Sequence, residues 1–595
     1  MIEYYTKRAQ ETEKALSDLK KKLYTTSTLR LCIFLAIAVF CFFLKTVPVG
    51  ASVGIIAAGV LLFGILIVKH HRLQKQKHYL EASLACDNNE IKALNLDLSP
   101  FDGAPEQLSS AHSFSLDLDL FGNNNSLFQL INRSCTDYGR QLLIRIFEEP
   151  LNDKKAIEER QEIVKELREK PELLHHFRVS GLIKTGTKTD YEEIKEFARS
   201  ERFIAKHKLW IGLSYLVPSI WVLAFILAFT IQIPFNWWVW LYVLTFVLSE
   251  SLAKKINRLQ QYIGKKADIL NSYTGLIRII ENETFTSEGL KIIQRQFAGK
   301  EKASASIRQL AQLISELEQR SNMLAHILLN PLLLWDIRKA IRIEMWKEKA
   351  GEDLISWMQG IGEFDAYTSL GLFSFNHPDY TFPNFTETYF QVNGKGLRHP
   401  LLNREACVEN DVSIDNAPYF LIITGANMAG KSTYLRTVGV NFVLACMGTC
   451  VCAKEFSLFP AKLVTSLRTS DSLNDNESYF FAELKRLKMI INRLEDGEQL
   501  FIILDEILKG TNSLDKQRGS LALVRQFVRL QSCGIIATHD LLLGELEKDF
   551  PDHIKNYRFE ADIENDRLQF SYRLQTGIAQ NMNASFLMKK MGITL

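Results

Sequence analysis

Two long apolar stretches interrupt an otherwise mixed pattern of polar and hydrophobic positions. The first comprises residues 31–44 and 47–68, separated by a segment with Lys45, and the second runs over 209–248 with a turn signal at Pro234. A helix of about 20 apolar residues crosses the core of a bilayer, so each stretch predicts a membrane-embedded helical hairpin. A signal peptide does not fit the first stretch, because a charged segment of about 27 residues precedes it and no small-residue cleavage site follows.

Basic residues flank both predicted hairpins, whereas the turns carry only Lys45 or no charge at all. The positive-inside tendency therefore predicts that both hairpins enter the membrane and return, which leaves the rest of the chain in the cytoplasm. A buried hairpin in a soluble core is the alternative for the second stretch, but it would have to hide about forty uncharged residues. The flanking basic residues are Lys20, Lys21, Lys22, Lys69, Arg72, Lys75, Lys77, Arg202, Lys206, Lys208, Lys254, Lys255 and Arg258.

The remaining chain divides into a helical part and a C-terminal part rich in short apolar runs. Apolar spacing predicts helices over 121–180, and residues 251–360 form a charged stretch with few Gly or Pro residues, typical of extended helical arms. From about residue 390, continuous apolar runs alternate with helix-forming segments, which predicts buried parallel strands in an α/β domain. Three such runs are YFLIITG at 419–425, QLFIILDE at 499–506 and SCGIIATHD at 532–540.

Composition alone would describe a soluble multidomain protein. The chain has 595 residues, of which 47% are hydrophobic and 23% charged, and this excludes collagen, low-complexity disorder and a disulfide-rich secreted miniprotein. The net charge of +3 is too small to indicate nucleic-acid binding by itself. Nine cysteines without zinc-site spacing indicate thiols in a reducing compartment. The average therefore conceals two uncharged hairpins joined to strongly charged segments.

The apolar run at 421–424 leads into Gly425-Ala-Asn-Met-Ala-Gly-Lys-Ser432, a full match to the phosphate-binding pattern GxxxxGK[ST] between a strand and a helix. The glycines let backbone amides turn toward the phosphates, and the N-terminus of the next helix adds positive charge. Lys431 is expected to pair with the β- and γ-phosphates of ATP. The hydroxyl of Ser432 is expected to bind Mg²⁺.

Two further strand ends supply the remaining candidate chemistry. Asp505 and Glu506 follow the apolar run at 501–504, so both acids are expected where the phosphates lie. Asp505 is predicted to hold Mg²⁺ through water, and Glu506 is predicted to polarise the attacking water. His539 follows the apolar run at 534–538 and is placed to hydrogen-bond the γ-phosphate or that water; a structural histidine is the alternative.

These segments resemble the MutS family of ABC-type ATPases. The resemblance covers residues 118–180 and 251–595 and is most specific over 420–540. TGANMAGKST at 424–433 is similar to the family's TGPNMGGKST, and flanking elements match as well. The other matching segments are SYFFAE at 478–483 (STFMxE in the family), LDEILKGTNSLD at 504–515 (LDEIGRGTST-D), ATHD at 537–540 (ATHY), RHPLL at 398–402, VEND at 408–411, LQFSYRLQTGIAQ at 568–580, and the core segments 118–167 and 362–370.

The resemblance implies a P-loop ATPase that uses ATP and Mg²⁺ and pairs as a homodimer, with Ser478 of one chain reaching the γ-phosphate in the other. Its family role implies DNA binding and DNA mismatch repair. The nucleotide-binding residues it implies are Gly425, Asn427, Met428, Gly430, Lys431, Ser432 and Thr433, with Ser432 and Asp505 at the metal and Glu506, His539 and Ser478 in catalysis.

The chain also departs from the family pattern. A predicted membrane hairpin takes the place expected for the mismatch-reading domain, and the second predicted hairpin falls where the lever arms would carry the DNA-gripping clamp. The C-terminal helix-turn-helix of the family is also expected to be missing, since the chain stops at Leu595. We therefore expect a membrane-anchored variant lacking the mismatch-reading domain. Ala426 and Ala429 replace the family's Pro and Gly, and both are small enough to keep phosphate binding.

The expected fold is an α/β C-terminal ATPase domain joined to an all-α core and lever region, with two transmembrane hairpins. Two functions remain open: a membrane-tethered ATPase acting on DNA, or a mechanochemical membrane ATPase without a DNA substrate. A conventional ABC transporter fits less well, since the signature is of the MutS type. The predicted division is an N-terminal cytoplasmic helical segment (1–27), a hairpin (28–69), a linker helix (70–117), a first core part (118–208), a second hairpin (209–250), a lever and second core part (251–390) and the ATPase domain (391–595).

Overall fold

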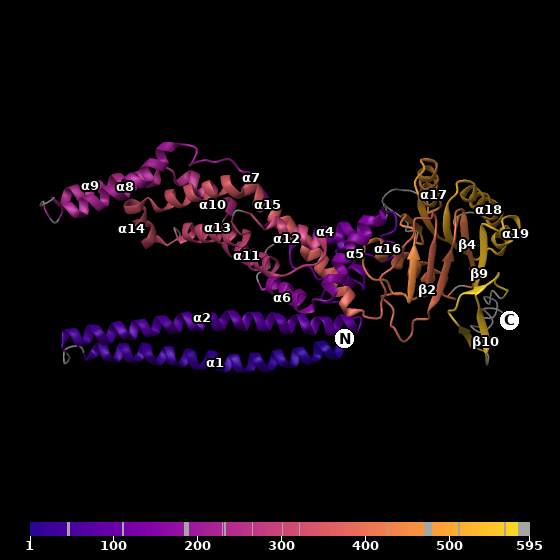
Figure 1. Cartoon of the computed structure of the whole chain (residues 1–595), viewed down its shortest axis with the longest axis horizontal. Helices are drawn as coiled ribbons and strands as arrows, with labels where there is room; N and C mark the ends of the chain where they lie inside the picture. Colours follow the sequence, from indigo (N-terminus) through magenta and orange to yellow (C-terminus); the bar gives the residue numbers. More distant parts are fainter. Residues whose placement is uncertain are drawn as a thin grey trace.

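The protein is elongated, with a sheet-containing domain at one end, a helical body in the middle and two helical projections that extend toward the opposite end (Figure 1). This computed structural model supports the predicted combination of an α/β C-terminal region with a mostly helical remainder. It describes residues 1–43, 48–109, 112–183, 190–228, 230, 234–263, 266–299, 301–319, 322–426, 428–468, 479–509, 512–564 and 567–580.

A six-stranded sheet forms the centre of the C-terminal domain, in the strand order β12-β9-β4-β8-β7-β6. All neighbours are parallel except β12, which pairs antiparallel with β9. The three apolar runs expected as strands form β4, β8 and β7, which lie side by side at its centre. The strands are β4 (Tyr419–Gly425), β6 (Lys462–Ser466), β7 (Leu500–Asp505), β8 (Cys533–Thr538), β9 (Ile554–Phe559) and β12 (Gln575–Thr576).

Helices cover this sheet because its strands are apolar on both faces. Buried residues of β4, such as Leu421 and Phe420, belong to two separate hydrophobic clusters. The helices are α16 (Lys431–Cys446), α17 (Tyr479–Glu495), α18 (Ser513–Arg529) and α19 (Leu546–Asp549), with a 3₁₀ turn η4 (Leu541–Glu545). A second sheet has the order β1-β5-β2-β3, and β10 pairs with β11. These strands are β1 (Asn384–Phe385), β2 (Val392–Leu397), β3 (Asn410–Ile414), β5 (Glu455–Leu458), β10 (Ala561–Glu564) and β11 (Arg567–Phe570).

The helical body is organised around α15 (Trp335–Asn376), which is kinked at Ala350. Its apolar side chains, among them Ile361 and Phe364, are fully buried against the neighbouring helices. The other body elements are η2 (Pro105–Gln107), α3 (Leu127–Ile131), α4 (Asp137–Glu148), α5 (Lys154–Arg168), α6 (Pro171–Leu182), α7 (Asp190–Arg199), α10 (Ala253–Ile263), α11 (Ala267–Asn282), α12 (Glu288–Gln296) and α13 (Ala303–Glu318).

The first projection is an antiparallel pair of long helices, α1 (Ile2–Phe42) and α2 (Val49–Leu94). Both run without a break through residues 27 and 69, the bounds assigned to the predicted hairpin. At their body end, the buried carboxylate of Glu90 binds the guanidinium groups of Arg133 and Arg178. Burial opposes ionisation of Glu90, but the two cations outweigh it and lower its pKa to about 2. This buried ionic cluster attaches the projection to the body.

The second projection contains α8 (Lys208–Leu227) and α9 (Phe235–Glu250), together with a third apolar helix, α14 (Met323–Leu333). The indole of Trp221 on α8 donates to the carbonyl of Pro331, and the hydroxyl of Tyr242 on α9 donates to that of Ile327. The charged pattern expected for 251–360 does not extend through α14, whose 11 residues include no acidic or basic side chain other than His326.

Three of the described helices are long and apolar enough to cross a membrane: α1, the Gly50–Leu94 part of α2, and α8. The 20 residues of α8 span about 30 Å at 1.5 Å per residue, which matches a bilayer core. With 16 residues, α9 is shorter. Large apolar side chains are exposed along both projections, including Leu61, Leu216 and Trp240.

Candidate functional site

The phosphate-binding loop connects the carboxyl end of β4 to the first turn of α16. Gly425 and Gly430 have φ angles of +152° and +106°, which favour glycine. A Cβ atom on Gly425 would lie 2.5 Å from the carbonyl oxygen of Phe559, so close packing also requires glycine there. Met428 has a φ of +66° and is exposed. Asn427, a predicted nucleotide contact, lies outside the described residues. The loop thus presents the N-terminus of α16 to a ligand.

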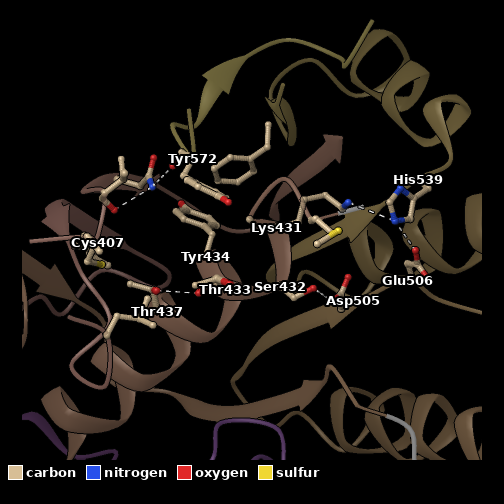
Figure 2. A pocket seen from close by; sticks show the side chains of 18 of the residues that line it. Cys407, Lys431, Ser432, Thr433, Tyr434, Thr437, Asp505, Glu506, His539 and Tyr572 are labelled. Carbon is tan, nitrogen blue, oxygen red and sulfur yellow. Dashed lines mark hydrogen bonds and ion pairs between the residues drawn. The ribbon is translucent and has the colours of Figure 1, made fainter. Parts of the chain in front are cut away.

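Lys431 is buried at the start of α16 and points back into the loop (Figure 2). Its amine donates to the carbonyl oxygens of Gly425 and Ala426 at 2.8 and 2.9 Å, and lies 3.3 Å from Nε2 of His539. Burial lowers the pKa of Lys431 to about 8. The amine is therefore already positioned beside the loop that would hold the phosphates.

Ser432 and Asp505 meet across the site, as Figure 2 shows. The Ser432 hydroxyl donates to Oδ2 of Asp505 at 2.5 Å, which joins the first turn of α16 to the carboxyl end of β7. A hydroxyl and a carboxylate are the oxygen donors that Mg²⁺ uses when nucleotide phosphates and water complete its octahedron. No cluster of three His, Cys, Asp or Glu side chains suited to a metal occurs among the described residues. The donor set thus fits a nucleotide-bound Mg²⁺ better than a metal held by protein alone.

Glu506 and His539 form a hydrogen-bonded pair at the ends of β7 and β8. Oε1 of Glu506 lies 2.7 Å from Nε2 of His539, and this hydrogen bond lowers the pKa of Glu506 to about 2. The backbone amide of Glu506 donates to the carbonyl of Ala537, and its φ of +52° is left-handed. Nε2 cannot both donate to Glu506 and accept from Lys431, so the shorter contact assigns its proton to the bond with Glu506. The carboxylate is ionised and fixed in direction.

These side chains line one cavity of about 610 Å³, a size typical of small-molecule sites. Besides the charged groups, its wall includes the aromatic side chains of Tyr434, Phe559 and Tyr572. Tyr572 stacks on Phe570 with ring centroids 5.9 Å apart and is partly exposed. The sequence analysis singled out residues 568–580 as a matching segment but assigned Tyr572 no role. Its position in the cavity wall depends on the packing of the segment after β11 near the start of α16, which the sequence pattern does not show.

The structure brings most of the predicted site residues together. Met428, Gly430, Lys431, Ser432, Thr433, Asp505, Glu506 and His539 all line the cavity. Gly425 contributes the carbonyl that accepts from Lys431. Ser478, the residue predicted to act in the opposite subunit, lies outside the described residues. The structure therefore places these side chains in one cavity, and their roles in nucleotide binding and catalysis stay predictions.

Comparisons with known proteins match both parts of the chain. The family model of MutS domain III matches residues 91–370, and that of MutS domain V matches residues 421–590. DNA mismatch repair protein MutS of Thermotoga maritima is 29% identical over 262 residues, which cover 43% of this chain and 32% of that protein. The protein of the same name from Thermosipho melanesiensis is 31% identical over 251 residues (41% and 30%), and MutS protein homolog 4 of Homo sapiens is 30% identical over 226 residues (36% and 24%). The chain spans about a third of the length of the first of these relatives.

Proposed function

Because this chain belongs to the MutS family, we propose that it is a membrane-anchored ATPase. In this proposal its C-terminal α/β domain, called the head below, binds and hydrolyses ATP with Mg²⁺. The single observation that carries this proposal is the convergence of Lys431, the Ser432–Asp505 pair and the Glu506–His539 pair at the carboxyl ends of three adjacent parallel strands. Such strand ends are where open α/β sheets bind their ligands.

In the proposed reaction, loop amides and the N-terminus of α16 hold the triphosphate, while the ammonium group of Lys431 exchanges its two carbonyl partners for phosphate oxygens. Ser432 and Asp505 would hold Mg²⁺, which neutralises charge developing on the phosphates. Glu506 accepts a proton from the attacking water, and His539 fixes the direction of that carboxylate. Two heads pair in this proposal, so that Ser478 of one chain completes the site of the other.

Contacts between the head and the body support a mechanical output. Arg436 on α16 and Arg468, just after β6, both bind the carboxylate of Asp119, which lies between η2 and α3 of the helical body. Asp117 accepts hydrogen bonds from the hydroxyl of Thr465 and the amide of Arg468. A shift of α16 upon nucleotide binding would therefore displace the segment that contains Asp117 and Asp119. We propose that this coupling changes the position of the two projections relative to each other.

Membrane anchoring is supported by the exposed apolar side chains on both projections, which extend to the same end of the molecule (Figure 1). We predict that full-length protein floats with lipid vesicles and that Leu61→Lys combined with Leu216→Lys lowers the floated fraction. Each lysine replaces an exposed leucine inside an apolar segment, where a charge costs about 2.5–3.5 kcal/mol at the bilayer centre. Vesicle flotation after an alkaline wash measures the effect.

The matched control is Met345→Lys, which changes an exposed apolar residue on α15 in the helical body. This variant is expected to float like the unmodified protein. Equal flotation of the double hairpin variant and the control would contradict membrane anchoring through these projections.

DNA binding is the second candidate, favoured by relatives named as DNA mismatch repair proteins. The tip of the second projection presents Trp237, Trp240 and Leu244, however, and offers no basic side chain for phosphates along α9. We therefore predict no anisotropy change when detergent-solubilised protein is titrated into labelled homoduplex or mismatched duplex at low salt. Binding that weakens steeply with salt would instead support a DNA role, and a preference for the mismatch would extend it to repair.

A further inference from the structure

A buried carboxylate outside the predicted catalytic set contacts the loop that carries Glu506. Glu483 is only 3% exposed and lies in the first turns of α17. Its two oxygens accept hydrogen bonds from the backbone amides of Leu508 and Lys509, at 2.5 and 3.1 Å. Burial raises the pKa of Glu483, and these two amide bonds partly oppose that effect. One side chain thus satisfies two consecutive amides just after the proposed base.

The loop held by Glu483 has an uncommon backbone conformation. Glu506 and Leu508 have φ angles of +52° and +60°, a region that costs energy for residues other than glycine. Ile507 and Leu508 are buried in the cluster that also contains Leu487 of α17 and Leu523 of α18. A conformation of this kind persists only where its surroundings fix it, and the paired amide bonds to Glu483 are the polar part of that support.

The same helix is attached at its other side to the segment leading into the helical body. Arg486, three residues after Glu483, donates to the backbone carbonyls of Thr465, His112 and Ser113. Figure 1 shows α17 at the edge of the C-terminal domain. Helix α17 also begins at residue 479, directly after the segment that contains Ser478. Helix α17 therefore contains most of the matching segment 478–483 and contacts both the segment around residue 113 and the loop that follows Glu506.

We propose that Glu483 is a positioning residue that holds Glu506 in its reactive geometry and makes that geometry depend on the place of α17. This inference rests on the proposed ATPase function. Glu483 does not line the cavity, so it acts through the loop and not on the nucleotide. A displacement of α17 moves the two amides held by Glu483 and with them the carboxylate of Glu506.

The test measures ATP hydrolysis and nucleotide affinity separately for Glu483→Gln in the full-length protein. Glutamine has the same shape but only one acceptor oxygen, so one amide loses its partner. We expect kcat to fall at least about tenfold, a part of the roughly 10²- to 10⁴-fold that a positioned base provides, with affinity for a non-hydrolysable ATP analogue within about twofold. The matched control is Glu495→Gln, an exposed glutamate at the end of the same helix, which should change neither quantity.

A double-variant cycle separates positioning from a general structural role. If Glu483 acts through Glu506, adding Glu483→Gln to Glu506→Gln produces no further loss of the residual hydrolysis. An additive loss, an unchanged kcat in Glu483→Gln, or an equal loss of kcat and affinity would overturn the inference. Should Glu483→Gln fail to fold, Glu483→Asp carries the same test, since it keeps the charge but shortens the side chain. An unmodified chain that does not hydrolyse ATP would refute the proposed function itself, whereas an active chain unaffected by Glu483→Gln refutes only this inference.

Discussion

Replacing Glu506 with glutamine is expected to reduce ATP hydrolysis by about 10²- to 10⁴-fold, the range that a positioned general base contributes, while ATP remains bound. Glutamine keeps the size of the side chain and can still contact His539, which lies 2.7 Å from the carboxylate. It cannot accept the proton of the attacking water. Because its pKa is about 2, the carboxylate of Glu506 is ionised at every pH at which the protein would be assayed, so the base is always available in the unmodified chain.

Single-turnover release of phosphate and retention of labelled ATP on a filter measure the two halves of this prediction. Retained ATP should also favour paired heads, which light scattering would detect as a doubled mass. The control is Glu545→Gln, an exposed glutamate in η4 after β8, which should leave both measurements unchanged. Undiminished hydrolysis in purified Glu506→Gln protein would remove Glu506 from the proposed mechanism.

The central strands and the phosphate-binding loop were predictable because their signals are local. A continuous apolar run such as residues 501–504 is typical of a buried strand, and the acids after it are then expected at the carboxyl end of that strand. The loop pattern likewise fixes Gly425 and Gly430 by backbone geometry, and both adopt the positive φ angles that the pattern requires. Neither inference needs to know which distant residues will meet.

The remaining features depend on contacts between segments far apart in the chain. Glu483 and Leu508 are 25 residues apart, and nothing in the sequence around either one shows that a buried carboxylate will hold two loop amides. Tyr572 reaches the wall of the cavity from a segment more than one hundred residues beyond the loop. The apolar helix α14 was not predicted, because it is short and lies between charged segments, so that residues 251–360 have a high average charge. Such features follow from packing, which a local pattern does not encode.

The two helical projections were predicted only in part. Their apolar segments were evident from the distribution of hydrophobic residues along the sequence, but the length of α1 and α2 was not. Polar residues 2–27 belong to the same helix as the apolar segment that follows them. Buried side chains in this polar part pack on the helical body; one is Tyr5, whose hydroxyl donates to the side chain of Asn376. A helix that is anchored in the body at one end and exposes apolar side chains at the other can transmit a displacement along its length.

Lys431→Ala is expected to weaken the binding of an ATP analogue by at least about 100-fold, since it removes a charge-assisted partner of the phosphates from a buried position.

The unmodified chain should also show a pH dependence of nucleotide affinity that the variant lacks. Burial lowers the pKa of Lys431 to about 8, so the amine of the free protein loses its proton above that pH. Binding then requires proton uptake, and affinity should fall by up to about tenfold per pH unit between about pH 8 and pH 9. Calorimetric titration of the two proteins across that range, with Lys548→Ala as the exposed control, tests both parts. A flat pH profile in the unmodified chain, or an alanine variant that binds as tightly, would contradict the role assigned to this amine.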